Sequence, residues 1–254
     1  MQLFSKVRSF MRSLIVLLIS IFLLNPVMAA DLDFDALKAR LAKSLPGFVP
    51  DKLKPSPVPG LYEVTMGTTV MYVSADGRHL ILGDIIDIET KQNLSGATRG
   101  QLILTALDTV PESQMIIIAP KKVRRTITVF TDVECPYCIK LHRDVPKLVA
   151  AGVRVRYLFF PRAGIGSSSY KKSVAVWCAK DRVDALGKAK FGGKLEMKTC
   201  KNPVTRHYQL GQQVGVRGTP MIIYDDGQVQ AGYSPAEKML EALGLSENKK
   251  VSAR

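Results

Sequence analysis

Two cysteines separated by two residues, Cys135 and Cys138, closely follow an apolar run of strand-forming residues that ends at Phe130. Residues 137–150 are predicted to be helical, which places the pair at the start of a helix that leaves a strand. A thiol at a helix start faces the positive end of the helix dipole and free backbone N–H groups, and both favour the thiolate. We therefore predict that Cys135 is the attacking thiol. Cys138, one turn into the helix, is predicted to be the more buried resolving thiol.

Other uses of the same spacing remain open. A zinc site ordinarily has a second close pair of ligands, whereas the other two cysteines, Cys178 and Cys200, are 22 positions apart. A purely structural disulfide between Cys135 and Cys138 would gain little from so short a loop. His142 is left without a role, because a single histidine on a helix is more often a surface or packing residue. We predict no metal site.

The amino terminus, residues 1–29, has the three parts of a secretory signal peptide. Basic residues precede the apolar run Leu14–Leu24, and small residues follow it. This run is too short for a transmembrane helix, which needs about 20 apolar residues. We predict export to the bacterial periplasm, with cleavage after Ala29 or Ala30. In an oxidising compartment, the even count of 4 cysteines predicts disulfides.

The chain is strongly basic. Its formal net charge is +14, and loss of the three basic residues of the signal peptide leaves +11. The densest basic run, residues 121–125, immediately precedes an apolar strand, and we interpret it as a solvated edge. Residues 247–254 are a short basic tail. The sequence contains no nucleic-acid-binding motif, so we expect no nucleic-acid partner.

Residues 30–92 are predicted to form a small α+β domain. A helical spacing of apolar residues covers residues 31–45, and the proline-rich stretch 50–59 is interpreted as an extended connection. A unit of about 60 residues buries little surface and often needs a staple or a partner, and this one has no cysteine. We therefore expect its sheet edge to pair with a second copy of the chain. The predicted strands are Leu61–Met66, Thr69–Val73, Leu80–Leu82 and Asp84–Ile88.

Residues 93–112 are predicted to be a linker helix that ends at Pro111. The domain that carries the cysteines is expected over residues 113–246. Its elements follow the order strand, helix, strand, helices, hairpin and helix, which is the order of a thioredoxin fold, and the fold class is α/β (α+β). The predicted elements are Thr126–Phe130, Tyr137–Ala150 with a kink at Pro146, Val153–Phe160, a helical insertion over 168–210, Met221–Tyr224, Gln228–Gly232 and Pro235–Leu243.

One further feature of this domain favours a redox function. Thr219-Pro220 stands just before an apolar strand, where a proline cannot donate to the ladder. A cis bond there would place Pro220 beside the cysteine pair, as in a thioredoxin fold, and an ordinary trans turn is the alternative. Cys178 and Cys200 are interpreted as a structural disulfide that stabilises by about 3 kcal/mol, and two buried free thiols are the alternative.

Several segments together are similar to one family. Phe130-Thr131-Asp132 precedes the cysteine pair, and Lys140-Leu141-His142 follows it. This segment resembles the active-site segment of the periplasmic disulfide isomerases of the DsbC/DsbG type, which have a thioredoxin fold. Other segments resemble that family's next strand, its structural disulfide, its cis-proline loop and part of its amino-terminal domain. They are residues 155–162, 177–181 with Cys200, 215–220 and 76–83.

The resemblance implies an enzyme, a thiol:disulfide oxidoreductase that rearranges or reduces incorrect disulfides in exported proteins and also acts as a chaperone. Such proteins are V-shaped homodimers joined by their amino-terminal domains, and their substrates are misfolded exported proteins. Pro136, Tyr137, Thr219 and Pro220 would form the substrate-binding active-site loops. The implied electron donor is a membrane reductase of the DsbD type. No cofactor is needed, because the cysteines carry the electrons.

Two positions depart from the related patterns. Pro136 stands where DsbC-type isomerases usually have glycine, so the dipeptide between the cysteines is closer to the DsbG branch. Val129 occupies the strand position where thioredoxins keep a buried acid, which argues against an efficient general reductase. The alternatives are a dithiol oxidase that donates disulfides, a DsbG-like chaperone or reductase of single cysteines, and a holdase chaperone in which the cysteines are secondary.

Overall fold

The computed structural model describes residues 34–246. The predicted signal peptide and the basic tail lie outside these residues. By its internal contacts the chain divides into two units, of which the first comprises the residues up to 48 together with residues 75–77. Within the described residues this first unit contains one helix, α2 (Phe34–Ser44), whose buried side chains are Leu37 and Leu41.

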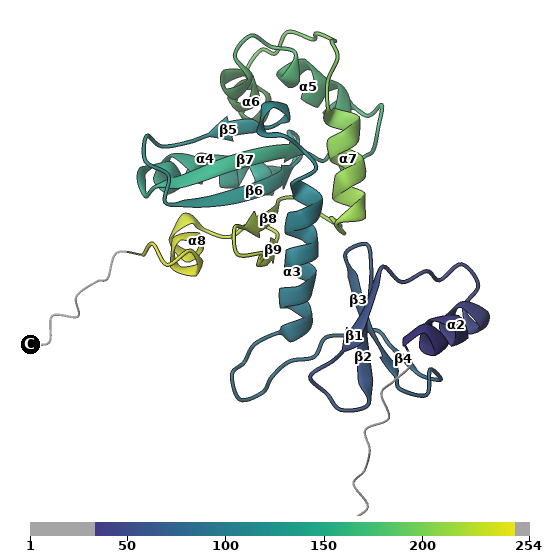
Figure 1. The fold of residues 1–254 in the computed structure, drawn as a ribbon. Helices are drawn as coiled ribbons and strands as arrows, with labels where there is room; N and C mark the ends of the chain where they lie inside the picture. Colours follow the sequence, from purple (N-terminus) through teal and green to yellow (C-terminus); the bar gives the residue numbers. More distant parts are fainter. Residues whose placement is uncertain (1–33, 247–254) are drawn as a thin grey trace, which may run out of the picture. The chain divides into compact units, whose positions relative to one another are not determined.

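An antiparallel sheet of four strands opens the second unit (Figure 1). Its strands, neighbours in chain order, are β1 (Lys52–Pro55), β2 (Leu61–Met66), β3 (Thr69–Ser74) and β4 (Leu80–Ile81). β1 corrects the prediction that residues 50–59 are only an extended connection, because its backbone pairs with β2 along its whole length. Pro55 is tolerated there because β1 is an edge strand, where one side of the backbone needs no partner.

Residues 84–88 do not form the strand that the sequence predicted. Their only pairing is an isolated bridge between Ile86 and Asn93. The carboxylate of Asp84 instead accepts from Asn93 Nδ2 at 2.6 Å and from Arg99 Nη2 at 2.7 Å. This segment is therefore fixed by polar contacts with the start of the next helix rather than by a sheet.

The helix α3 (Leu94–Leu107) is shorter than the predicted linker helix over 93–112. Asn93 caps it by accepting a backbone N–H of the first turn at 2.6 Å, as a good N-cap residue does. The chain leaves the helix before Pro111, which disfavours helical backbone in the residue before it, and forms the short 3-10 helix η1 (Glu112–Gln114).

The buried side of α3 belongs to the core of the cysteine-bearing domain. Ile103 and Leu107 are each 2% exposed and lie in one hydrophobic cluster with Phe130, Leu158 and Ile223. The helix therefore contributes to the stability of that domain in addition to linking it to the preceding sheet.

A five-stranded sheet forms the centre of the cysteine-bearing domain (Figure 1). Its strands are β5 (Ile116–Ile118), β6 (Arg125–Thr131), β7 (Val153–Phe159), β8 (Met221–Tyr224) and β9 (Val229–Ala231). Their spatial order is β5-β7-β6-β8-β9, with β6 and β7 parallel and the other pairs antiparallel. β5 is an edge strand that the sequence analysis did not identify. This topology, with the helices below, confirms the mixed α and β class.

The same domain also contains helices that pack on this sheet. They are α4 (Pro136–Ala150), α5 (Ser168–Trp177), α6 (Arg182–Phe191), α7 (Val204–Gln213) and α8 (Ala236–Ala242). α4 continues through Pro146 to Ala150, and α5 to α7 make up the predicted helical insertion. No helix in residues 34–246 is long and apolar enough to cross a membrane.

The central strand β6 is buried on both faces. Because side chains alternate along a strand, Ile127 and Val129 join a cluster with Leu141 and Leu148 of α4, whereas Phe130 joins the cluster that includes α3. A strand with helices packed on both sides has an apolar sequence of this kind.

The basic run at 121–125 ends in an ion pair. Residues 121–124 are exposed, as the sequence indicated. Arg125 instead donates to Asp225 from Nε at 2.8 Å and from Nη2 at 2.5 Å, and from Nη1 to the Leu243 carbonyl at 2.7 Å. It therefore ties the start of β6 to the β8–β9 turn and to the end of α8.

Two helical glycines give opposite predictions for stability. A Cβ at Gly211 of α7 would lie 2.4 Å from Phe160 Cδ2, whereas the nearest contact of a Cβ at Gly187 of α6, His142 Nε2, is at 4.0 Å. We expect Gly211→Ala to lower the free energy of unfolding by about 1–3 kcal/mol through overpacking. We expect Gly187→Ala to raise it by about 0.5–1 kcal/mol, because alanine loses less backbone entropy on folding. Equilibrium unfolding in guanidinium chloride measures both, and two effects of the same sign would contradict this packing.

Candidate active site

Cys135 is the N-cap residue of α4 and has an extended backbone, with φ −79° and ψ 122°. Pro136 takes the first helical position, where its fixed φ suits the helix and its missing N–H leaves nothing unpaired. The side chains of Cys135 and Cys138 are each 1% exposed, whereas Tyr137 between them is 62% exposed. The segment therefore presents an aromatic ring to solvent directly beside two shielded sulfur atoms.

The loop before β8 lies against the first of these sulfur atoms. The Cys135 sulfur lies 3.2 Å from the Thr219 carbonyl oxygen, to which it donates when protonated, and the Thr219–Pro220 peptide bond is cis. Thr219 Oγ1 is buried and has no hydrogen-bond partner among the described residues. The pairing of β8 with β6, with Met221 opposite Phe130, holds this loop beside the cysteines.

The environment of Cys135 favours its thiolate. The hydrogen bond from the Cys138 thiol is the largest cause that lowers the pKa of Cys135, to about 5. The Cys138 backbone N–H and the positive charge of Arg162 act in the same direction, and the causes that lower the pKa together outweigh burial. Cys135 is therefore ionised at neutral pH, and the thiolate is the form that attacks disulfides.

Cys138 has the opposite electrostatic environment. Burial raises the pKa of its thiol far above the ordinary range, and its hydrogen bond to Cys135 raises it further. The charge of Lys190, the Thr131 hydroxyl and the Asp132 N–H lower it, but by less than burial raises it. Cys138 is therefore a neutral thiol that donates to the Cys135 thiolate.

Asp132 organises the loop between β6 and α4. Its Oδ1 accepts from the Glu134 N–H at 2.8 Å and the Ser169 hydroxyl at 2.5 Å, and its Oδ2 accepts from the Arg162 N–H at 2.9 Å. Burial raises the pKa of this carboxyl, but the hydrogen bonds led by that from Ser169 lower it more, so it stays ionised. Arg162 Nε lies 3.3 Å from the same Oδ2, which fixes the guanidinium whose charge favours the Cys135 thiolate.

Sequence reasoning missed a group of buried polar side chains around the two thiols. Lys190 of α6 is 3% exposed and donates from Nζ to the Thr131 hydroxyl at 2.8 Å. His142, which the sequence left without a role, is hydrogen-bonded through Nδ1 to the Tyr157 hydroxyl at 2.9 Å. Burial and the charge of Lys190 lower the pKa of His142 to about 4, so it is neutral. The available signal was the position of Lys190 four residues after Leu186, on the buried face of a helix.

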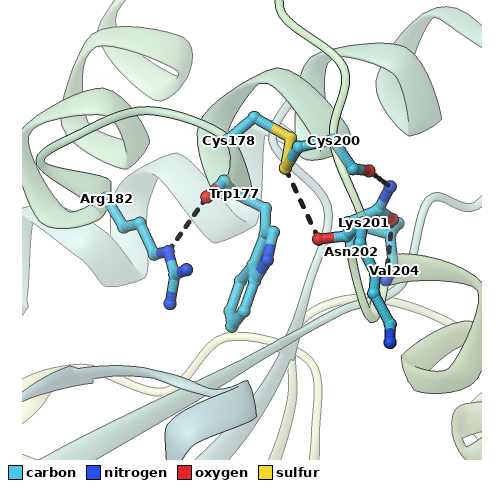
Figure 2. The surroundings of a disulfide bond; sticks show 7 residues. All are labelled: Trp177, Cys178, Arg182, Cys200, Lys201, Asn202 and Val204. Carbon is cyan, nitrogen blue, oxygen red and sulfur yellow. Dashed lines mark hydrogen bonds between the residues drawn. A yellow bond between two sulfur atoms is a disulfide. The ribbon is translucent and has the colours of Figure 1, made fainter.

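Cys178 and Cys200 are joined by a disulfide, with their Cα atoms 5.8 Å apart. Figure 2 shows the bridge between the end of α5 and the loop that leads to α7. The Arg182 guanidinium lies 3.6 Å from the centre of the Trp177 ring and donates to the Trp177 carbonyl at 2.9 Å. Asn202 Nδ2 donates to the Cys200 carbonyl at 2.8 Å. The bridge therefore fastens a long loop to a helix whose end is already well packed.

The residues of this site support one kind of chemistry by themselves. In residues 34–246 no group of three or more histidine, cysteine or acidic side chains is placed to hold a metal ion. What the site offers is a thiolate at Cys135 and a neighbouring thiol at Cys138, the two groups needed for exchange of disulfides through a mixed disulfide.

Comparisons with known proteins agree with this chemistry. Residues 112–246 match a family model described as a thioredoxin-like domain, and residues 28–96 match the amino-terminal domain of disulfide bond isomerase proteins. The chain is 37% identical to thiol:disulfide interchange protein DsbC of Dickeya dadantii, over 76% of this chain and 79% of that one. It is 34% identical to DsbC of Escherichia coli, over 88% of this chain and 92% of that one. Among solved structures it is similar to a disulfide interchange protein of Neisseria gonorrhoeae, with a TM-score of 0.46 and 28% identity, over 54% of this chain and all of that one.

A thioredoxin fold with a dithiol at the start of its first internal helix defines the class of thiol:disulfide oxidoreductases. Within this class, the chain belongs to the DsbC family of thiol:disulfide interchange proteins and is a disulfide isomerase. The resemblance found in the sequence is thereby confirmed.

The ionisation of Cys135 can be measured directly. We expect the ultraviolet absorbance of thiolate in the reduced protein to titrate with a midpoint of about 5. Cys138→Ala is expected to raise that midpoint, because it removes the largest cause of the lowered pKa, and Cys135→Ala is expected to abolish the transition. Since this pKa is lower in the folded than in the unfolded chain, its contribution to the stability of the reduced protein is lost as pH falls through about 5. An unchanged midpoint in Cys138→Ala would contradict the assignment.

The disulfide between Cys178 and Cys200 is expected to matter for stability alone. It spans 22 positions, so replacing both cysteines with alanine is expected to lower the free energy of unfolding by about 3 kcal/mol. The Cys135 midpoint should stay the same, because neither cysteine is among the groups that set that pKa. Chemical denaturation and the thiolate titration test the two parts, and a shifted midpoint would show that the bridge also shapes the active site.

Proposed function

We propose that Cys135 is the nucleophile and Cys138 the resolving thiol of the isomerase, and that the Cys178–Cys200 bridge has a structural role. The observation that carries this proposal is the difference between the first two thiols. The pKa of Cys135 is lowered to about 5, whereas burial keeps Cys138 protonated beside it. One thiol is thus ready to attack, and the other stays in reserve until the first has reacted.

The reaction begins when the Cys135 thiolate attacks a substrate disulfide. A bond forms between Cys135 Sγ and one substrate sulfur atom, and the other substrate sulfur leaves as a thiolate. If a different thiolate of the substrate then attacks the mixed disulfide, Cys135 is released and the substrate has been isomerised. If Cys138 attacks instead, the substrate is reduced and Cys135 and Cys138 form a disulfide.

The proposed substrate contacts lie on both sides of the thiolate. Pro136 and the exposed ring of Tyr137 come from the start of α4, and Thr219 and Pro220 come from the loop before β8. The unpartnered Thr219 hydroxyl supports this assignment, because a buried polar atom without a partner is costly unless something binds it.

The assembly and cellular setting follow from the same family. The protein is a homodimer joined through its amino-terminal domain, works in the periplasm after cleavage of the signal peptide, and rearranges disulfides in misfolded exported proteins. Exposed apolar side chains on β4 and the segment after it support the dimer, since such a sheet edge is a template for pairing. They are Leu80, Ile81, Leu82, Ile86 and Ile88. A membrane reductase of the DsbD type keeps Cys135 and Cys138 reduced.

One observation favours a second candidate, a dithiol oxidase. A low pKa of Cys135 stabilises the reduced form, and a disulfide whose reduced form is stable is a strong oxidant. The amino-terminal domain separates the two candidates, because donating disulfides needs only the catalytic domain.

Refolding of a protein with scrambled disulfides tests the proposal. We compare the chain from Asp31 with a version that starts at Asn93, which keeps α3 because Ile103 and Leu107 belong to the catalytic core. We expect the long chain to restore the substrate's activity and the short one only to reduce its disulfides, and Cys135→Ser to inactivate both. Equal oxidation of substrate thiols by both versions would support the oxidase instead.

A further inference from the structure

Lys190 lies in the core, and no carboxylate of residues 34–246 forms an ion pair or hydrogen bond with it. Its Nζ donates to Thr131 Oγ1 at 2.8 Å and to the Asp132 backbone carbonyl at 3.4 Å, and the residue is 3% exposed. Both acceptors are neutral, whereas a buried charge ordinarily needs an opposite charge nearby. An anion that forms near Lys190 during the reaction would therefore stabilise its buried positive charge.

The groups around Lys190 identify that anion. The Tyr157 ring lies 5.9 Å from Lys190 Nζ, but burial raises the pKa of its hydroxyl, which therefore stays protonated. His142 is neutral, because burial lowers its pKa. The Asp132 carboxylate is bound by Ser169 and Arg162. Among the acidic groups that raise the pKa of Lys190, Cys138 has the largest effect, ahead of Cys135 and Asp132, so ionisation of Cys138 is the event that most stabilises the ammonium. The titratable groups facing Lys190 are Cys135, Cys138 and His142 of α4, Asp132 in the loop before it, and Tyr157 of β7.

Thr131 connects the lysine with this thiol. Its hydroxyl oxygen accepts from Lys190 Nζ at 2.8 Å, and the same hydroxyl lowers the pKa of the Cys138 thiol by favouring its ionised form. Two residues earlier on the same side of β6, Val129 is fully buried and has no proton to exchange. The polar path to Cys138 on this strand therefore runs through Thr131 to Lys190.

We propose that Lys190 is a positioning residue of the resolving step, which takes up through Thr131 the proton that Cys138 must lose and then holds the positive charge beside the new thiolate. This inference rests on the proposed roles of Cys135 and Cys138. It adds the group that makes the second, deeply buried thiol reactive.

When Lys190 is neutral, the Thr131 hydroxyl can turn to donate to its amine and accept from the Cys138 thiol. The proton of Cys138 then passes to the Thr131 oxygen while the Thr131 proton passes to the Lys190 amine. The Cys138 thiolate donates an electron pair to Cys135 Sγ, and the bond between Cys135 and the substrate sulfur breaks. The substrate leaves as a thiolate and is reduced, Cys135 and Cys138 are oxidised to a disulfide, and Lys190 remains an ammonium ion.

The ionisation of Lys190 suits this role. Burial lowers its pKa to about 8, and the charges of Cys138, Cys135 and Asp132 limit that decrease. Near neutral pH a fraction of the molecules therefore has a neutral amine that can accept a proton. Once Cys138 is ionised, the ammonium and the thiolate lie close together in a medium of low dielectric constant, where opposite charges attract strongly.

A two-phase reaction of the reduced full-length protein with dithiobis(nitrobenzoate), an aromatic disulfide whose released thiolate is coloured, isolates the step. The first phase is attack by Cys135 and depends on reagent concentration. The second is attack by Cys138 on the mixed disulfide and does not. In the wild-type protein we expect the second rate to rise with pH and to level off above about 8, where Lys190 is neutral.

Lys190→Met removes the amine with little change in shape. Near neutral pH we expect it to slow the second phase about tenfold or more, as a shift of one pKa unit in Cys138 would, and to abolish the levelling near 8. The first phase should change by no more than about threefold, because the charge of Lys190 acts less directly on Cys135. Lys188→Met, an exposed lysine of the same helix paired with Asp184 at 2.6 Å, is the matched control and should behave like the wild type.

Thr131→Val tests the same path independently of Lys190→Met, and near-ultraviolet circular dichroism shows whether each variant is folded. It should slow the second phase like Lys190→Met, and the double variant should be no slower than the slower single one, since both act on one path. A wild-type pH profile of the second phase in either folded variant, or an equal loss in Lys188→Met, would overturn the inference.

Cys138→Ser separates this inference from the proposed function. With the proposed roles, this variant releases one coloured thiolate per chain and stops, whatever Lys190 does. If it still releases the second, Cys138 is not the resolving thiol, and the proposed function fails first. If Cys138→Ser stops after one coloured thiolate, Cys138 is the resolving thiol. In that case a second phase that is the same in the wild type, Lys190→Met and Thr131→Val overturns only the proposed role of Lys190.

Discussion

The antiparallel pairing of β6 with β8 is the constraint on which the active site depends. Cys135 and Thr219 are 84 positions apart, yet the cysteine sulfur lies 3.2 Å from the Thr219 carbonyl. The register of the two strands makes this contact, and burial of β6 on both faces fixes the register. A slip of one residue would move Ile127 and Val129 from one hydrophobic cluster to the other. Every side chain of β6 would then face the wrong side of the sheet, and both clusters would lose their packing.

The same arrangement places the two thiols in different environments, and this difference gives them different reactivities. Cys135 is at the start of α4, beside free N–H groups and within reach of the Arg162 charge, whereas Cys138 lies one turn deeper, where burial is the largest influence on its pKa. The same burial that protects Cys138 from outside oxidants also makes its ionisation costly. A site that uses Cys138 must therefore bring charge to it from within the core, and Lys190 is placed to do so.

The sequence predicted the parts of the structure that local patterns determine. The cysteine motif, β6 with its apolar run and the helix after it could be placed because each has a strong local pattern. β5 and β1 could not, because both are short edge strands that exist through pairing with a distant neighbour. Residues 84–88 looked like a strand because their composition suits one, but their polar groups bind the start of α3. Lys190 was hidden because a lysine is ordinarily exposed, and only the three-dimensional path through Thr131 gives it a role.

The Cys178–Cys200 bridge has a consequence for how the protein itself is made. Four cysteines can be paired in three ways, and just one of these joins Cys178 to Cys200 and leaves Cys135 with Cys138. A newly made chain that cross-links one cysteine of each pair has no usable dithiol until the error is reversed. The new enzyme can therefore contain the same kind of wrong disulfide as its substrates, and a correctly folded copy has the chemistry to rearrange it.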